Sequence, residues 1–319
     1  MTVQSNLEKV LNEGTFAVTG ELGPKRGVDA EHLRKMAELM KPYCDAFNIT
    51  DNQTAVVRMS SIAAGIIIKQ MDMDPVIQIV TRDRNRLAIQ ADVLGASAHG
   101  IMNILALTGD HQTMGNHPGA KNVHDIDSIQ LIQCLKGMRE GRFMNGEELE
   151  TAPPHLFIGA AANPFGHPLE FRVTRLAKKI KAGVQFIQTQ PIFAMDIFKK
   201  YIEDARNRGL LEKVHVLAGI IPIKSIGMAK YMRDHVAGVI VPDEKIERLQ
   251  KAPEGIKEKK ERIKKIREEA VKMSVDEVHE ALEIPGVHGV HIMAVAWEEI
   301  IPEIVKQAGL DKERPKYKT

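Results

Sequence analysis

The amino-acid sequence predicts an α/β protein that folds as a single-domain (β/α)8 TIM barrel. Short segments rich in Val, Ile and Phe alternate with amphipathic segments of helical period, the pattern of right-handed parallel β/α units. The strand segments and their spacing within 319 residues match the size of a closed eight-stranded barrel. Polar residues follow nearly every strand segment, whereas an open doubly wound sheet concentrates its site at one switch point. The first β/α turn also lacks the glycine fingerprint that a dinucleotide-binding open sheet would show. We therefore favour the barrel over the open sheet.

Each predicted strand is short and apolar, with the β-branched and aromatic residues that pleated sheets favour. The strands are expected at residues 16–20, 46–50, 76–80, 103–107, 155–160, 186–189, 214–218 and 289–295. Between them, apolar residues recur at intervals of three and four positions, which predicts amphipathic helices. These helices are expected at residues 30–40, 59–69, 84–94, 127–137, 169–181, 195–208 and 225–235.

Two segments interrupt the alternation of strands and helices. Residues 110–127 contain two glycines and a proline and predict a long loop after the fourth strand, and such loops are usually functional or mobile. Residues 242–283 are charged and helical, which predicts an insertion. Its alternating charges are typical of a solvated helix, and a basic docking face is the alternative. Neither segment resembles a linker, so we expect one domain over residues 1–319.

The charge balance argues against a nucleic-acid or membrane partner. Lys and Arg number 44 and Asp and Glu 42, so the formal net charge is only +2 and no global field attracts polyanions. No uninterrupted apolar run approaches the roughly 20 residues that cross a bilayer. Cys44 and Cys134 stand outside any metal or redox spacing, and we expect two buried thiols in a reducing compartment. These observations predict a cytoplasmic protein.

The polar residues that follow the strands are expected to form one site. In a (β/α)8 barrel the carboxyl ends of all strands meet at a single mouth, where binding and catalytic residues are found. The most informative stretch is residues 105–110, an apolar run that ends in Thr108, Gly109 and Asp110. The candidates at this mouth are Glu21, Thr50, Asp51, Gln78, Thr81, Arg82, Asp83, Thr108, Gly109, Asp110, Asn163, His167, Gln188 and Gln190.

Two carboxylates at the mouth suggest acid chemistry. Glu21 stands between Gly20 and Leu22, and this apolar setting suits a residue that keeps and donates a proton. Asp110 then acts as a charge-stabilising group. The alternative is that each carboxylate only caps the helix that follows it.

Basic residues near the mouth suggest an anionic ligand. Arg172, Arg175, Lys178 and Lys179 on one predicted helix can pair with a cofactor phosphate, although solvated surface cations are the alternative. Residues 82–85, with the sequence RDRN, either hold a ligand or form a helix cap with first-turn ion pairs.

Histidines provide weaker candidates. Those at 111, 117 and 124 are irregularly spaced in the long loop and have no accompanying carboxylate pattern, so we expect no metal site there. His167 follows the fifth strand directly and is the better site candidate. His288 and His291 flank the last strand, and we expect both to be structural.

Six motifs in register together resemble one known family. They read GELGP at 20–24, NITDN at 48–52, TRDRN at 81–85, ALTGD at 106–110, ANP at 162–164 and TQPIF at 189–193. Over nearly its whole length the chain resembles the methylenetetrahydrofolate reductase family of flavin-dependent (β/α)8 barrels. It is most similar to the acetogen reductases that pair with a zinc-binding subunit and to the reductase half of bifunctional homocysteine methyltransferase/reductase proteins.

The resemblance implies a cytoplasmic oxidoreductase of one-carbon metabolism. A reduced flavin passes a hydride to 5,10-methylenetetrahydrofolate and gives 5-methyltetrahydrofolate. Glu21 matches the family's general acid, Asp110 the aspartate beside flavin and pterin, and Gln190 the pterin-binding glutamine. The positions that match flavin-binding residues are Thr50, Asp51, Gln78, Thr81, Thr108, Gly109, Asp110, Asn163, His167, Arg175, Lys178 and Lys179. These cations suit either FAD, the family default, or FMN.

Three departures from the family pattern concern the folate tail and the electron donor. Trp297 stands where many members have an arginine that binds the glutamate tail of folate. Ile226 replaces a phenylalanine that stacks on nicotinamide, and Asn163 replaces a flavin-contacting tyrosine. The electrons are therefore expected either from NAD(P)H or, in a homo- or hetero-oligomer, from a zinc-binding partner subunit or an iron-sulfur protein. A flavin-free barrel lyase or aldolase is the remaining alternative, but no strand-end lysine or metal set supports it.

Overall fold

A computed structural model describes residues 4–311 and confirms the predicted barrel. Eight parallel strands pair in the order of the sequence, and β1 closes the barrel by pairing with β8. The strands are β1 Ala17–Leu22, β2 Ala46–Ile49, β3 Pro75–Val80, β4 Asn103–Leu107, β5 Phe157–Ala162, β6 Phe186–Pro191, β7 His215–Ile220 and β8 Gly289–Ile292. β8 is shorter than predicted because the chain turns after Ile292, where the Val295 N–H bonds back to the Met293 carbonyl.

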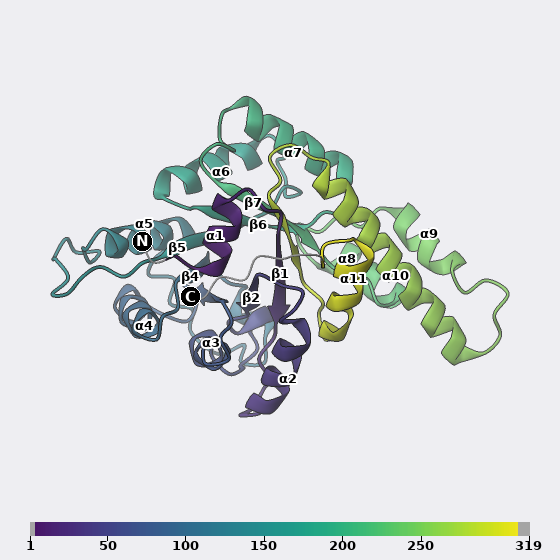
Figure 1. Cartoon of the computed structure of the whole chain (residues 1–319), viewed down its shortest axis with the longest axis horizontal. Coiled ribbons are helices and arrows are strands. Elements are labelled where there is room, and N and C mark those ends of the chain that lie inside the picture. Colours follow the sequence, from purple (N-terminus) through teal and green to yellow (C-terminus); the bar gives the residue numbers. More distant parts are fainter. Residues whose placement is uncertain (1–3, 312–319) are drawn as a thin grey trace.

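Helices surround the barrel, as Figure 1 shows. They are α1 Asn6–Asn12, α2 Ala30–Met40, α3 Ser61–Lys69, α4 Arg86–Ala98, α5 Ser128–Arg139, α6 Phe171–Ala182, α7 Met195–Asn207, α8 Ile226–His235, α9 Asp243–Lys251, α10 Lys259–Leu282 and α11 Ile301–Gln307. The seven amphipathic segments expected from the sequence all form helices. Side-chain oxygens cap several of them, as when Asn85 accepts from the Ala88 N–H at the start of α4.

The inside of the barrel is apolar at the amino ends of the strands. Alternate residues point inward, so each strand contributes one side chain to each interior layer. Phe157 of β5 and Phe186 of β6 fill this end with stacked rings whose centroids lie 4.9 Å apart. Gly159 makes room for them, because a Cβ at that position would overlap the Phe186 ring. This layer closes the barrel at the end opposite the mouth.

The short helix α1, which the sequence analysis did not single out, covers that closed end. Leu7, Val10 and Leu11 are buried against the amino-end layer of the barrel. Ser5 caps the helix, and the Asp74 carboxylate accepts a hydrogen bond of 2.9 Å from the Leu7 N–H. Burial raises the pKa of Asp74 to about 6, and the hydrogen bonds that it accepts only partly offset this effect.

The charged segment at 242–283 forms α9 and α10, which extend away from the barrel in Figure 1. Ion pairs join the two helices: Arg248 contacts Glu269 and Asp276 (2.8 Å), and Lys245 contacts the buried Glu277 at 2.7 Å. Many of the charges therefore stabilise the helix pair itself. No helix within residues 4–311 is long and apolar enough to cross a membrane.

The fold predicts that α1 is essential for stability. Replacing Leu11 by Ala removes buried methyl groups from a closely packed layer, so we expect the free energy of unfolding to fall by about 2–5 kcal/mol. Val28→Ala is the matched control, since Val28 is 96% exposed and should leave stability unchanged. Denaturant titration measures both effects. A Leu11→Ala protein as stable as the control would contradict the role assigned to α1.

Candidate functional site

Two cavities open at the carboxyl ends of the strands. The first, which we call the cationic pocket, has a volume of about 210 Å³ and lies between the ends of β4–β6 and helix α6. The second, the Glu21 groove, is larger at about 990 Å³ and lies between the β1–α2 segment and the loop after β8. The predicted mouth therefore contains two binding volumes.

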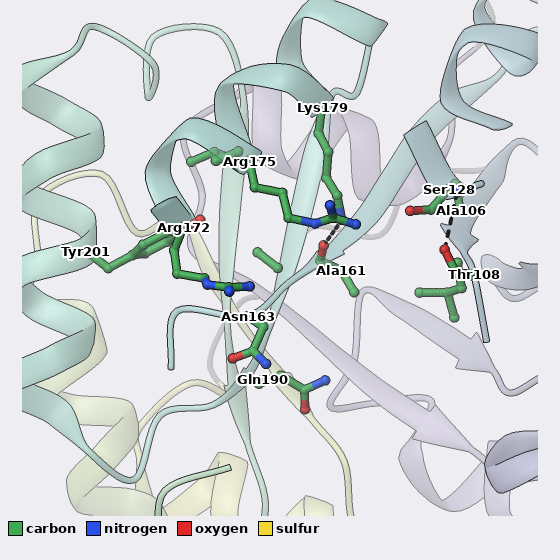
Figure 2. A pocket seen from close by; sticks show the side chains of 13 residues that line it. Ala106, Thr108, Ser128, Ala161, Asn163, Arg172, Arg175, Lys179, Gln190 and Tyr201 are labelled. Atoms are coloured by element: carbon green, nitrogen blue, oxygen red, sulfur yellow. Dashed lines mark hydrogen bonds between the residues drawn. The ribbon is translucent and has the colours of Figure 1, made fainter. Parts of the chain in front are cut away.

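Lys179 and Arg175 of α6 stand one helical turn apart and both line the cationic pocket (Figure 2). The Lys179 ammonium donates to the Ala161 carbonyl at the end of β5. Burial, with a smaller contribution from the positive charge of Arg175, lowers the pKa of Lys179 to about 8. Two close cations, one of them largely desolvated, favour an anion between them.

Arg172 is the third cation in this pocket, and the chain around His167 orients it. Its guanidinium donates to the His167 carbonyl at 2.5 Å. The His167 side chain is exposed and does not line the pocket. Lys178 also points elsewhere, with its ammonium 5.5 Å from the centre of the Phe171 ring. The structure thus places Arg172, Arg175 and Lys179 together and leaves His167 and Lys178 outside.

Polar groups from three strand ends complete the cationic pocket. Gln190 and Asn163 lie below the cations in Figure 2. The Thr108 hydroxyl accepts a hydrogen bond of 3.3 Å from the Ser128 N–H, which joins the end of β4 to the start of α5. Tyr201 of α7 also lines the pocket. Ser128 and Tyr201 were not among the predicted site residues, because both belong to helices rather than to strand ends.

Arg82 holds three of the strand-end loops together. Its guanidinium donates twice to Asp83, at 2.6 and 2.7 Å, and also to the carbonyls of Asn52 and Asp110. Gly109, the residue before Asp110, has a φ of +89°, and a Cβ atom at this position would lie too close to the side chain of Arg82. The Asp110 backbone is therefore fixed, while its side chain is exposed at the mouth.

Asp51 is likewise engaged within the protein. Arg84 donates to both of its carboxylate oxygens, at 2.6 and 3.3 Å, and the Val80 N–H donates to one of them. Residues 82–85 therefore form ion pairs and the helix cap of α4, which is the second of the two interpretations given for them. Asp51 lines neither cavity.

Three further predicted residues lie beneath the mouth. Thr50, Thr81 and Gln78 are buried. The hydroxyls of Thr50 and Thr81 have no hydrogen-bond partner within residues 4–311. A buried hydroxyl without a partner costs free energy, so a ligand that supplies a partner is favoured at these positions.

Glu21 stands at the inner end of the Glu21 groove and at one end of a buried polar network. Nε2 of His291 lies 3.9 Å from Oε2 of Glu21, and Nδ1 of the same ring lies 2.9 Å from the Thr19 hydroxyl. Gln188 donates to that hydroxyl at 3.3 Å. Gln188 and Asn48 exchange two further hydrogen bonds, of 2.6 and 2.9 Å. The network therefore spans the inside of the barrel.

His291 was predicted to be structural, and its burial and its contact with Thr19 are compatible with that role, but its place beside Glu21 was not predicted. His291 is buried and lies on β8 beside the strand that carries Glu21. The alternation of side chains along a strand could have shown this position. Residues 289, 291 and 293 of the predicted last strand point to the same face, so a histidine at 291 faces the inside of the barrel. His288 points instead to the closed end, where burial lowers its pKa and its ring meets His215 edge to face at 5.2 Å.

The long loop after β4 is confirmed and packs beside the mouth. Apart from the 3-10 turn Gln112–Met114, residues 110–127 have no regular structure. The Asn116 side chain accepts from the Val57 N–H at 3.1 Å, and Gly115 packs directly on the Ala55 carbonyl. Within the described part of the chain, no group of three or more His, Cys, Asp or Glu residues is placed to hold a metal ion.

This chain is a (β/α)8 barrel whose candidate site lies at the carboxyl ends of the strands, as in other proteins of this class. The closed barrel, the cations at its mouth and the buried carboxylate are the features that place it there. A profile of the methylenetetrahydrofolate reductase family matches residues 6–309, and the chain belongs to this family.

Two curated relatives agree with this assignment. Methylenetetrahydrofolate reductase 2 of Schizosaccharomyces pombe is 27% identical over 331 residues, which cover 97% of this chain and 48% of the relative. A probable methylenetetrahydrofolate reductase (NADPH) of Caenorhabditis elegans is 24% identical over 267 residues, which cover 82% of this chain and 36% of the relative. The chain therefore spans less than half the length of either relative.

A solved structure shares the fold. It is an uncharacterized protein from Clostridium thermocellum that binds two copies of 5-methyl-5,6,7,8-tetrahydrofolic acid. The superposition has a TM-score of 0.63 at 17% identity and covers 96% of this chain and 98% of the other. At this identity the likeness concerns the barrel alone.

The cationic pocket predicts pH-dependent anion binding. Sulfate is the probe, since it stays a dianion over the range used. Lys179 is a cation below about pH 8 and becomes neutral above it, so sulfate affinity should fall as the pH rises from 7 to 9.5. Lys179→Met should bind sulfate about tenfold more weakly at pH 7 and lose most of this pH dependence, as isothermal titration would measure.

Lys178→Met is the matched control, because Lys178 is the next residue on α6 and stands outside the pocket. It should retain the wild-type affinity and pH profile. Equal sulfate affinity in the Lys179→Met and wild-type proteins would contradict the assignment of the pocket.

Proposed function

We propose that this chain reduces 5,10-methylenetetrahydrofolate to 5-methyltetrahydrofolate with a bound flavin as the hydride carrier. The observation that carries the proposal is the pairing of two cavities at one mouth, one lined by cations and one rooted at the buried Glu21. Family membership supports the same chemistry. The first cavity suits the phosphate of a flavin, and the second suits a folate.

The residues present fit a flavin. Arg175 and Lys179 supply cations for a phosphate of either FAD or FMN, and Arg172 adds a third. The unpartnered hydroxyls of Thr50 and Thr81 supply hydrogen-bonding groups for a polar ring system or ribityl chain. When bound, the flavin supplies a hydride to the one-carbon unit of the folate.

Glu21 is the proposed general acid. It donates its proton to N10 of the folate, which opens the five-membered ring and leaves an iminium carbon ready to accept hydride. The groove that Glu21 lines is wide enough to admit the substrate, while only 9% of the Glu21 residue is exposed. The largely buried carboxyl group therefore has little contact with water.

His291 is the proposed positioning residue for Glu21. The Thr19 hydroxyl has two acceptors within reach of its hydrogen, Nδ1 of His291 at 2.9 Å and the Val290 carbonyl at 3.4 Å, and we propose that it donates to the nearer one. The imidazole hydrogen then stands on Nε2 and faces the Glu21 carboxyl group. It stabilises the carboxylate that remains after Glu21 has given up its proton.

Asp110 and Gln190 complete the proposed site. The exposed Asp110 carboxylate stands on a loop fixed by Arg82, so it can stabilise the iminium cation without moving. Gln190 lines the cationic pocket and offers both a donor and an acceptor to the pterin ring. In this proposal flavin and pterin meet between the two residues.

The proposed electron source is a partner protein of the kind that serves acetogen-type reductases. Ile226, at the first turn of α8, offers an aliphatic side chain where a nicotinamide would stack on an aromatic ring. Asn163 instead bonds to the Phe165 N–H and packs against Gly238. Direct reduction by NAD(P)H is the alternative donor.

Glu21→Gln tests the general-acid role. The amide keeps the shape of the side chain but has no acidic proton, so reduction of methylenetetrahydrofolate should fall by about 10²–10⁴-fold. Flavin content and the rate of flavin reduction should stay at wild-type values. Single-turnover stopped-flow absorbance with dithionite-reduced protein measures the folate step directly.

Two results would contradict this proposal. Near-normal folate reduction by Glu21→Gln protein would remove the general-acid role. A wild-type protein that stays colourless after incubation with FAD and with FMN would remove the flavin.

The absorbance spectrum of the flavin-loaded protein also tests the electron donor. Anaerobic NADH or NADPH should leave the yellow colour of the wild-type protein unchanged, whereas dithionite or the physiological partner should bleach it. Bleaching by either nucleotide alone would contradict the partner-dependent source and leave the folate chemistry intact.

A further inference from the structure

The first half of α10 extends beyond the barrel on the side of the mouth. α10 contacts β7 and β8, and its carboxyl end at Leu282 leads directly to the amino end of β8 at Gly289, so the helix runs antiparallel to the strands. Its buried residues begin only at Ala270. The preceding residues 259–269 extend about 16 Å, at roughly 1.5 Å per residue, past the carboxyl ends of the strands. Figure 1 shows this end of α10 away from the barrel, beside α9.

Arg267 places this part of α10 next to the Glu21 groove. Its guanidinium lies 5.5 Å from the centre of the ring of Trp297, which is buried in the loop after β8. Ala296 and Glu298, the neighbours of Trp297 in that loop, both line the groove. A molecule that binds to the start of α10 therefore lies beside the mouth of the barrel.

Cations greatly outnumber carboxylates in this part of the chain. Residues 257–267, which we call the cationic arm, contain seven Lys and Arg residues and two Glu residues. The Glu258 carboxylate caps α10 by accepting hydrogen bonds from two N–H groups of the first turn, so it is already engaged. Lys257, Lys259 and Lys260 are exposed and form no ion pair in the described part of the chain. The arm therefore presents uncompensated positive charge.

The second half of α10 has a different charge pattern. Its carboxylates pair with Arg248 and Lys245 of α9, and these pairs hold the two helices together. In the arm, by contrast, Lys264 and Lys265 share a single carboxylate, that of Glu268, at 3.9 and 2.8 Å. A solvated helix with balanced charges thus describes the second half of α10 better than it describes the arm.

The apolar stripe of α10 continues into the arm and becomes exposed there. Ile263, Ile266 and Ala270 follow one another at intervals of three and four residues, so they share one face of the helix. Ala270 is buried, Ile266 is half-buried and Ile263 is 43% exposed. Lys259 and Lys260 are the neighbours of Ile263 one turn earlier on the same face. An apolar side chain beside cations is typical of the centre and rim of a protein interface.

The position of the arm favours a macromolecular partner over a small molecule. Lys25, Arg26 and Lys35 line the Glu21 groove, as the cations of α6 line the cationic pocket, but the residues of the arm line neither cavity. The two Glu residues among its cations disfavour nucleic acid, whose backbone is uniformly negative. A single exposed isoleucine is also too little apolar surface to anchor the chain in a membrane. These features together favour an acidic protein.

We infer that the cationic arm is the docking surface of an acidic protein that carries electrons to the flavin. This inference rests on the proposed function, in which a partner protein is the electron source. Carboxylates of the partner pair with Lys257, Lys259 and Lys260, and an apolar residue among them contacts Ile263. Each reduced carrier gives one electron, so two carriers and one proton from water supply what the oxidised flavin takes up before it donates hydride.

A bacterial ferredoxin, a small acidic one-electron carrier, is the probe for this docking surface. In isothermal titration, oxidised ferredoxin should bind the flavin-loaded wild-type protein about tenfold more weakly at about 200 mM salt than at about 20 mM. Replacing Lys257, Lys259 and Lys260 together by Glu should weaken binding at low salt by about 100-fold. Ile263→Ser should weaken it by about fivefold and leave the salt dependence unchanged.

The matched control replaces Lys181, Lys200 and Lys213 by Glu. These lysines are exposed as well and lie on α6, on α7 and before β7, so the control changes the net charge equally at a different place. It should keep the wild-type affinity for ferredoxin. In anaerobic stopped-flow experiments, reduced ferredoxin should reduce the flavin of the arm variant about 100-fold more slowly than that of the control. Both variants, once reduced by dithionite, should reduce methylenetetrahydrofolate at the wild-type rate.

Several results would overturn the inference. Equal ferredoxin affinity in the arm variant and the control would place the docking surface elsewhere, and a wild-type protein that binds no ferredoxin would remove it. Tighter binding of a short DNA duplex or of anionic phospholipid vesicles, lost in the arm variant, would assign the arm to a different class of partner. If dithionite-reduced wild-type protein reduces no folate, the proposed function fails, and the titration alone then decides whether the docking surface exists.

Discussion

Gln188 and Asn48 meet across the inside of the barrel and exchange two hydrogen bonds, and the rest of the mouth depends on this pair. Buried amides must be satisfied, so the pair fixes the position of β6 relative to β2. Gln188 also reaches Thr19, which in turn meets His291 beside Glu21. Below this layer the barrel is closed by apolar side chains and α1, and above it the surface is polar.

This layering explains how one fold separates stability from chemistry. The packing of Phe157, Phe186 and Leu11 excludes water from the closed end. At the open end, two groups of cations stand on different helices, with Lys179 on α6 and Lys35 on α2. Glu21 and Asp110 come from strand ends that are fixed by the barrel and by Arg82. In the proposed function, the cationic pocket binds the phosphate of the flavin and the neighbouring Glu21 groove binds the folate.

The sequence predicted the barrel well because alternating strands and helices leave few topologies open. It also placed Glu21 and Gln190 at the mouth, since strand ends converge in any closed barrel. It could not show that Asp51 is bound by Arg84, or that Lys178 and Lys179 point in different directions, because adjacent helical residues differ by about 100° in direction. The place of His291 beside Glu21 could not be predicted for a related reason, because it comes from pairing between β1 and β8, and Thr19 and His291 are 272 positions apart in the chain.

A crystal structure of the protein with its flavin and 5-methyltetrahydrofolate would test the central claim most directly. The account predicts a flavin phosphate within hydrogen-bonding distance of Arg175 and Lys179, and the folate with N10 beside Glu21 in the neighbouring groove. A flavin phosphate on Lys25 and Arg26, or a pterin ring remote from Glu21, would contradict it.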